Sequence, residues 1–198
     1  MKALLAALLA GLVQAASIAL PGSGAPSWWL QIASLALLVH LLRTAPGWRA
    51  AALRGWVFAT AWLAGVFWWL FISMHTYGGL AAPLAALAVL GLAIFLGSYY
   101  AVVSGYFHAV APAHKALAAL VFAFLWLLAE LARGQWWTGF PWGAGGDARI
   151  DGPLARLAPA VGGYRGAGDG RPRAGHPAAG AAARRADRGR RRPAAPAI

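Results

Sequence analysis

One stretch of the sequence combines a carboxylate, a guanidinium and a tight aromatic turn. Glu130 and Arg133 stand three residues apart, so on a helix they share one face, where the guanidinium stabilises a carboxylate near a membrane boundary. Gly134 is expected to end that helix. In the following Gly139-Phe140-Pro141-Trp142, proline fixes its own φ and biases Phe140 towards an extended conformation. The charged pair fits either a structural or a functional role, since ionisable groups inside membranes are often functional.

A second polar segment, His75-Thr76-Tyr77-Gly78-Gly79, follows a long apolar stretch. His75 could donate a hydrogen bond to a lipid headgroup, or it could be an interfacial residue at a helix end. The chain contains no cysteine, which excludes disulfides, thiolate metal sites and cysteine nucleophiles from this polypeptide. We predict no cofactor and no metal site.

The composition is that of a membrane protein. Hydrophobic residues make up 61% of the 198 residues and charged residues only 11%, which is too apolar for a soluble domain of this size. A helix needs about 20 mainly apolar residues to cross the hydrocarbon core. Candidate spans are residues 3–20, 28–42, 56–74, 80–104 and 116–132. We therefore predict an all-α fold, with about five transmembrane helices in residues 1–162 and a periplasmic aromatic loop over 133–153.

Small residues recur at every fourth position in two of these stretches. The rows are Ala7, Gly11, Ala15 and Ala19 in the first stretch, and Ala93, Gly97, Ala101 and Gly105 along the fourth. At that spacing helix backbones approach closely, which predicts a bundle, although an alanine-rich chain also produces such rows by chance. The first stretch has a second interpretation as a signal peptide, because Met1-Lys2 precedes it and Ser17-Ile18-Ala19 resembles a cleavage site.

Basic residues alternate between the predicted loops. Lys2 precedes the first span, Arg43, Arg49 and Arg54 fall between the second and third, and Lys115 lies with His108 and His114 before the fifth. The loops at 21–27 and 75–79 have neither Lys nor Arg. Because basic loops are retained in the cytoplasm, we predict a cytoplasmic N-terminus.

Residues 163–198 differ from everything before them. They are rich in Arg, Gly, Ala and Pro, and they contain no Leu, Phe, Trp or Met. This composition cannot form a packed core, so we expect a disordered basic tail. Its residues are typical of a GC-rich gene read in a shifted frame, and restoring the frame near Gly162 should then yield further apolar spans and a domain with Glu, Lys and Cys. The alternative is a native tail that binds anionic lipid or nucleic acid.

Several motifs together resemble the apolipoprotein N-acyltransferase family, bacterial inner-membrane enzymes that add the third acyl chain to lipoproteins. The matching segments are Trp28-Trp29-Leu30-Gln31, Ser73 to Gly79, Glu130 to Trp142, Ile150-Asp151-Gly152-Pro153-Leu154 and Leu157-Ala158-Pro159. They cover the chain to about Gly162, in order and at family-like intervals. One departure is Asp147-Ala148-Arg149, where the family commonly has an aromatic residue followed by a small or polar one.

The resemblance implies that the family continues beyond Gly162 into more membrane helices and a periplasmic nitrilase-like domain with a Glu–Lys–Cys triad. It implies partners for this chain: a phospholipid acyl donor, a diacylglyceryl-apolipoprotein and membrane lipids, without nucleic acid. This chain would be the membrane portion, without catalytic residues and inactive alone. Our hypothesis for its substrate or docking loops names His75, Tyr77, Gly78, Gly79, Gly139, Phe140, Pro141 and Trp142.

Two other functions fit parts of the sequence. A small transporter or channel subunit would need a central ionisable residue, or a Pro/Gly break flanked by polar groups, and no predicted span carries either. A membrane-anchored basic adaptor would use the arginine-rich tail, and it predicts strong salt-dependent binding by that tail.

Overall fold

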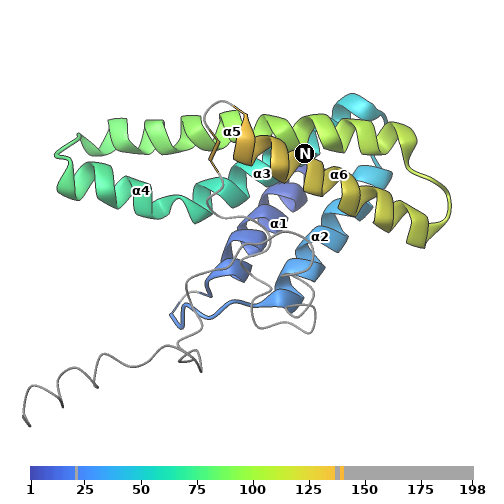
Figure 1. Cartoon of the computed structure of the whole chain (residues 1–198), viewed down its shortest axis with the longest axis horizontal. Coiled ribbons are helices and arrows are strands. Elements are labelled where there is room, and N and C mark those ends of the chain that lie inside the picture. Colours follow the sequence, from blue (N-terminus) through green and yellow to red (C-terminus); the bar gives the residue numbers. More distant parts are fainter. Residues whose placement is uncertain (21, 137–138, 141–198) are drawn as a thin grey trace, which may run out of the picture. The chain divides into compact units, whose positions relative to one another are not determined.

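A computed structural model describes residues 1–20, 22–136 and 139–140, all within the first of two units, Met1–Gly162. In this part the chain is helical and has no strand, as predicted (Figure 1). The elements are α1 (Lys2–Ile18), α2 (Trp28–Arg43), α3 (Trp48–Val66), α4 (Trp68–Ile72), the π-helix η1 (Ser73–Tyr77), α5 (Ala82–Val110) and α6 (Lys115–Gln135). The predicted tail at 163–198 and most of the predicted loop at 133–153 lie outside the described residues.

The described helices differ in whether they are long enough to cross a membrane. By length and composition α5 and α6 qualify, and α3 qualifies only together with the segment Trp68–Tyr77, to which it is bent by 51°. α1 and α2 have 17 and 16 residues. At 1.5 Å per residue each is about 25 Å long, short of a core of about 30 Å. Two or three crossings are therefore supported, and the full set of five remains a prediction.

The third predicted stretch, 56–74, differs from the structure at both ends. Its helix begins at Trp48, so Arg49 and Arg54 lie on α3 and not in a loop. The helix accommodates Arg54 because its Nη1 donates to the Leu41 carbonyl, 2.6 Å away. After α3 the helix breaks at Phe67, whose ψ of 12° is far from the helical value. Helix then continues past residue 74 to Tyr77 as α4 and η1.

Basic side chains from α3 and α5 lie within hydrogen-bond distance of carbonyls at the carboxyl end of α2. Besides Arg54, the Nδ1 atom of His108 lies 2.9 Å from the Leu42 carbonyl oxygen. Arg43 at the end of α2 donates to the Ala113 carbonyl, 3.3 Å away in the loop before α6. Cations are favourable at a helix carboxyl end, where carbonyls lack intrahelical donors. The structure thus gathers residues from separate basic segments at one end of the helices. His108 lies on α5, which extends beyond the predicted 80–104 to Val110.

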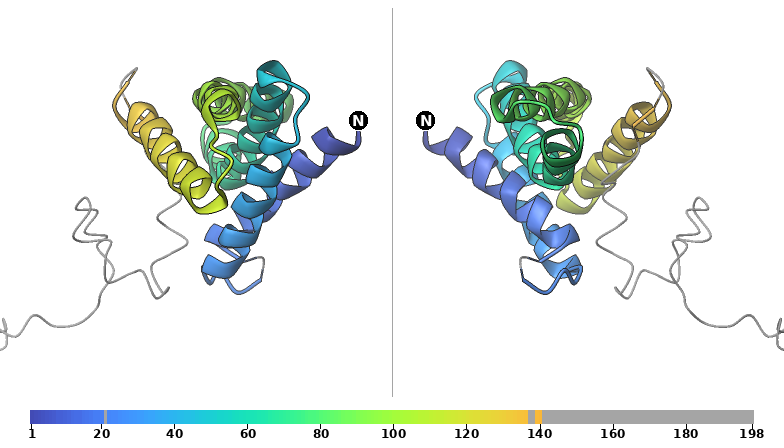
Figure 2. Two further views of the ribbon diagram at one scale, coloured as in Figure 1. Left: turned by 90° about the vertical axis from the view of Figure 1, so that its right-hand side faces the viewer. Right: turned by 90° about the vertical axis from the view of Figure 1, so that its left-hand side faces the viewer.

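Both predicted rows of small residues lie at helix contacts with α3. Figures 1 and 2 show α3 beside α5, with α1 against α3 and α6 against α5. Gly11 of α1 faces the backbone of Phe58, and Ala15 faces Gly65. On α5, Gly97 faces the side chains of Thr60 and Trp56, and Gly105 faces Ala52. Ala19 does not belong to this contact, because α1 ends before it and it is exposed.

Gly55 provides a test of the α3–α5 contact. An added Cβ there would overlap the Ser104 hydroxyl and lie 3.1 Å from the Tyr100 carbonyl oxygen. We expect Gly55→Ala to lower the free energy of unfolding by about 1–3 kcal/mol, and Ser104→Gly to restore part of the loss. The control is Gly91→Ala, because nothing lies within 4 Å of that Cβ and alanine favours a helix by up to about 1 kcal/mol. Thermal unfolding in detergent measures both, and equal stability of G55A and G91A would contradict the close contact.

Candidate functional site

Beyond α6 the chain folds back onto Arg133. The Phe140 N–H donates to the Arg133 carbonyl at 2.9 Å, and Arg133 Nη1 donates to the Phe140 carbonyl at 3.1 Å. The Gly139 N–H donates to the Trp136 carbonyl at 3.1 Å. We call residues 133–136 and 139–140 the Arg133–Phe140 turn. Three residues singled out in the sequence, Arg133, Gly139 and Phe140, therefore form one local unit that is joined by hydrogen bonds.

Glycine is required in this turn at Gly139. α6 continues through Gly134 to Gln135, so the prediction that Gly134 ends the helix is wrong by one residue. Gly139 has a φ of +70°, a conformation that L side chains rarely adopt. A Cβ at Gly139 would also overlap the Gly134 carbonyl oxygen. The backbone reversal occurs at Gly139, where the chain turns back towards α6.

The guanidinium of Arg133 lies beside a cluster of aromatic rings from three helices. Trp62, Tyr100 and Trp126 come from α3, α5 and α6, with ring centroids 5.3, 5.6 and 4.7 Å apart. Arg133 is only 1% exposed, and its guanidinium carbon lies 6.0 Å from the Trp62 ring. An electron-rich ring face at this distance attracts a cation, and more strongly where water is excluded.

Glu130 contacts the same aromatic cluster. Its Oε1 accepts a hydrogen bond from Trp126 Nε1 at 3.0 Å, one helical turn earlier on α6. Glu130 and Arg133 therefore both contact the aromatic rings where α3, α5 and α6 meet. These contacts fit a structural role for the pair.

Phe140 connects this turn to the bend between α3 and α4. Its ring lies edge-on to the fully buried Phe67, with centroids 5.1 Å apart. Phe67 is the residue at which the helix breaks. The break therefore lies directly beside the predicted aromatic loop, a proximity that no sequence motif indicated.

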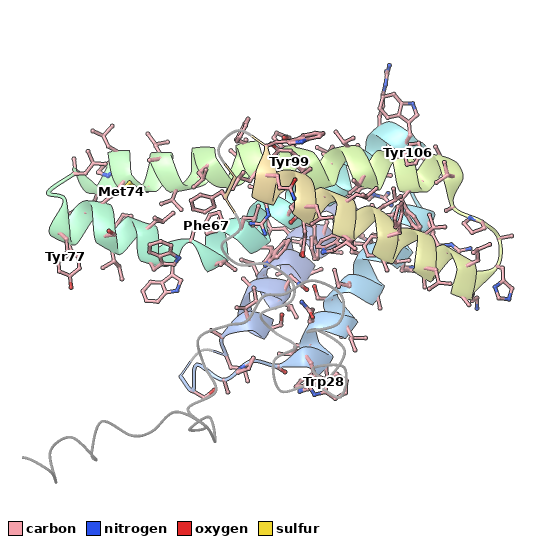
Figure 3. The ribbon with its side chains drawn as sticks, viewed as in Figure 1. Trp28, Phe67, Met74, Tyr77, Tyr99 and Tyr106 are labelled. Carbon is pink, nitrogen blue, oxygen red and sulfur yellow. The ribbon has the colours of Figure 1, made fainter. Side chains whose placement is uncertain are left out.

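The other predicted loop lies elsewhere. His75 Nδ1 is 2.8 Å from the Leu80 carbonyl oxygen, and its ring packs on Phe71, so its contacts stay within its own segment. Tyr77 is 85% exposed at the far end of η1 (Figure 3). From Phe67 to Tyr77 the helical segment extends about 15 Å. The ring contact of Phe140 is with Phe67, at the start of this segment, whereas Tyr77 is at its end. Pro141 and Trp142 lie outside the described residues.

An apolar groove between α5 and α6 ends beside the Arg133–Phe140 turn. It has a volume of about 660 Å³, within the range of small-ligand sites. Its lining includes Phe95, Ser98, Tyr99, Val102, Leu128, Ala132, Gln135 and Trp136. Sequence reasoning missed this groove, because it forms where small residues such as Ala132 face large ones on a different helix. We call it the α5–α6 groove.

The Arg133–Phe140 turn predicts a specific pattern of amide exchange. Gly139→Ala should strain the left-handed backbone by about 1–2 kcal/mol and break the bond from the Phe140 N–H to Arg133, so exchange at that amide should rise. Gly24→Ala is the matched control, since Gly24 has a φ of +67° and nothing within 4 Å of an added Cβ. Hydrogen-exchange mass spectrometry of peptides covering 133–140 measures both. Unchanged protection in G139A would refute the turn.

Comparisons with known proteins agree with the resemblance found in the sequence. The family model of the apolipoprotein N-acyltransferase N-terminal domain matches residues 4–166. The apolipoprotein N-acyltransferase of Verminephrobacter eiseniae is 65% identical over 162 residues, which cover 80% of this chain and 30% of the relative. That of Ralstonia nicotianae is 46% identical over 140 residues, covering 69% of this chain and 27% of the relative.

A third relative, the apolipoprotein N-acyltransferase of Azotobacter vinelandii, is 41% identical over 155 residues, covering 75% of this chain and 29% of the relative. The chain therefore spans about 30% of the length of these curated relatives. Its helices α5 and α6 are long and apolar enough to cross a membrane. Since the family match covers most of its length, this membrane protein belongs to the apolipoprotein N-acyltransferase family.

Proposed function

We propose that this chain is the membrane portion of an enzyme that transfers an acyl group from a phospholipid to the diacylglyceryl-cysteine of an apolipoprotein. The family match over residues 4–166 is the observation that carries this proposal. The same match favours an acyltransferase over the transporter subunit and the basic adaptor, because neither explains the agreement along α1 to α6.

Acyl transfer through a covalent intermediate needs a nucleophile, a base that activates it and donors that hold the oxyanion. The chain has no cysteine, so a thiolate nucleophile has to come from residues beyond this sequence. The contribution of the described helices is then to position lipid substrates and to support the residues that react with them.

We place the chain in the bacterial inner membrane, with its N-terminus on the cytoplasmic side and the Arg133–Phe140 turn on the outer side. The gathering of Arg43, Arg54 and His108 at the end of α2 supports this orientation, because basic segments are retained inside. α6 begins at Lys115 beside that end and runs for 21 residues, about 30 Å, to the turn. The turn would therefore face the compartment in which lipoproteins are matured.

The α5–α6 groove has the properties of a site for one acyl chain of the phospholipid. It is apolar and lies between the two helices that are long enough to span the bilayer, so a lipid could enter it sideways from the membrane. Ser98 and Gln135 add polar atoms, and Trp136 lies where the groove meets the turn. An acyl chain bound there would have its ester end close to Phe140.

Filling the groove should weaken the use of the phospholipid. In the full-length relative from Verminephrobacter eiseniae, phenylalanine at the position that corresponds to Ala132 should raise the KM for phospholipid by about tenfold, a loss of about 1.4 kcal/mol of binding, while kcat changes little. Ala119→Phe is the matched control on the same helix, because Ala119 is exposed and does not line the groove. Acylation assays in detergent micelles over a range of phospholipid concentrations give both constants. Equal KM values in the two variants would reject the groove as the donor site.

The aromatic loop should contribute separately to turnover. In this chain the Phe140 ring packs on Phe67, so alanine at the corresponding position of the same full-length relative should lower kcat/KM at least fivefold, because the loop loses its fixed position. Phe124→Ala serves as the control, since Phe124 is 61% exposed on α6. Acylation of a lipopeptide acceptor is the measurement, and wild-type turnover by F140A would argue against a docking role for this loop.

The segment His75–Gly79 is proposed as a second, distinct docking region at the end of η1.

A further inference from the structure

A second apolar groove lies between α3 and α5, near the basic end of the helices. Its volume is about 490 Å³, and it is lined by Trp48 and Ala52 of α3 and by Ala101, Val102, Gly105, Tyr106 and Ala109 of α5. We call it the α3–α5 groove. Its floor is made of small residues at a close backbone approach: a Cβ on Gly105 would lie 3.2 Å from the Ala52 Cβ and 3.3 Å from the Trp48 carbonyl oxygen. The two helices cannot close the groove with their own side chains.

Two aromatic residues form the walls at the mouth of this groove. Trp48 and Tyr106 are each 58% exposed, and such amphipathic rings are enriched at the depth of lipid headgroups. Tyr106 lies near the carboxyl end of α5, at the opposite end from Tyr77 (Figure 3). The groove thus extends from a headgroup-level mouth along apolar helix surface, which is the shape that a single acyl chain requires.

Arg49 places a cation beside this mouth. Its guanidinium carbon lies 5.3 Å from the centroid of the Trp48 ring. Arg43 and Arg54 donate to backbone carbonyls, whereas Arg49 is exposed and, among the described residues, makes no hydrogen bond or ion pair. Stacking on a ring leaves the edge of a guanidinium open, and that edge matches a phosphate in a bidentate geometry.

No carboxylate competes for this cation in the described part of the chain. Glu130 is the single acidic residue there, and it lies near the other end of α6. A partner seated in the groove therefore meets an apolar channel with an uncompensated positive charge at its mouth. An anionic amphiphile with one negative group above an alkyl chain is complementary to both features.

We propose that the α3–α5 groove binds one anionic phospholipid, with an acyl chain between Trp48 and Tyr106 and the phosphodiester on Arg49. Val102 lines both this groove and the α5–α6 groove, but all other lining residues differ, and the proposal does not rest on the acyltransferase function. A neutral helix of another protein, or of a second copy, would fill the apolar channel but would leave the Arg49 charge without a partner.

The test compares lipid retention by the 198-residue chain in detergent, measured by native mass spectrometry with dioleoyl phosphatidylglycerol or dioleoyl phosphatidylcholine. We expect one phosphatidylglycerol to bind at least tenfold more tightly than phosphatidylcholine. Arg49→Gln should abolish that preference. Lys115→Gln is the matched control, because it removes the same charge from an exposed residue that does not line the groove.

A second variant tests the apolar channel. Ala109→Phe fills the groove from an exposed position, so it should leave the fold intact while it lowers retention of phosphatidylglycerol by at least tenfold. Brominated phosphatidylglycerol should quench part of the tryptophan fluorescence of the chain, and Trp48→Phe should remove the part that comes from the groove. Equal retention of the two lipids, equal loss in R49Q and K115Q, or unchanged retention in A109F would each overturn the proposal.

Discussion

The contact between α3 and α5 is the interaction on which the rest of the described structure depends. Lipid is as apolar as the helices, so burying apolar side chains between them gains little, and close backbone approach with dispersion has to hold them together. Gly55 on α3 and Gly97 and Gly105 on α5 allow that approach. The same absence of side chains leaves space elsewhere along the pair, so the α3–α5 groove and the tight contact have one origin.

The aromatic cluster of Trp62, Tyr100 and Trp126 explains how a buried guanidinium is kept inside a membrane protein. A charge removed from water needs compensation, and Arg133 has the face of an indole together with the carbonyl of Phe140. The charge in turn fixes the first residues beyond α6. The bend at Phe67 belongs to the same arrangement, since it brings the Phe67 ring against Phe140. Core packing and the position of the loop are therefore coupled.

Hydropathy and residue spacing predicted the helices and both rows of small residues, because these signals depend on residues close together in the sequence. They did not predict the start of α3, since Arg49 and Arg54 suggested a loop and only the carbonyl of Leu41 on another helix explains Arg54. The break at Phe67 has no proline to mark it, Gly65 alone did not indicate it, and the ring that packs on Phe67 comes from the far end of the described chain. The separation of the two predicted loops and the two grooves also depend on contacts between residues far apart in the sequence, so local patterns could not predict them.

The shortness of α1 and α2 has a consequence for the membrane itself. Each is about 25 Å long, and basic side chains from other helices already satisfy the last carbonyls of α2, so this helix can end below the headgroups without exposing bare polar backbone to lipid tails. If both helices cross the bilayer, the adjoining lipid has to thin to match them, at a fraction of a kcal/mol for each ångström of mismatch. The protein would then be surrounded by a bilayer of uneven thickness, thinnest beside α1 and α2 and of ordinary depth beside α5.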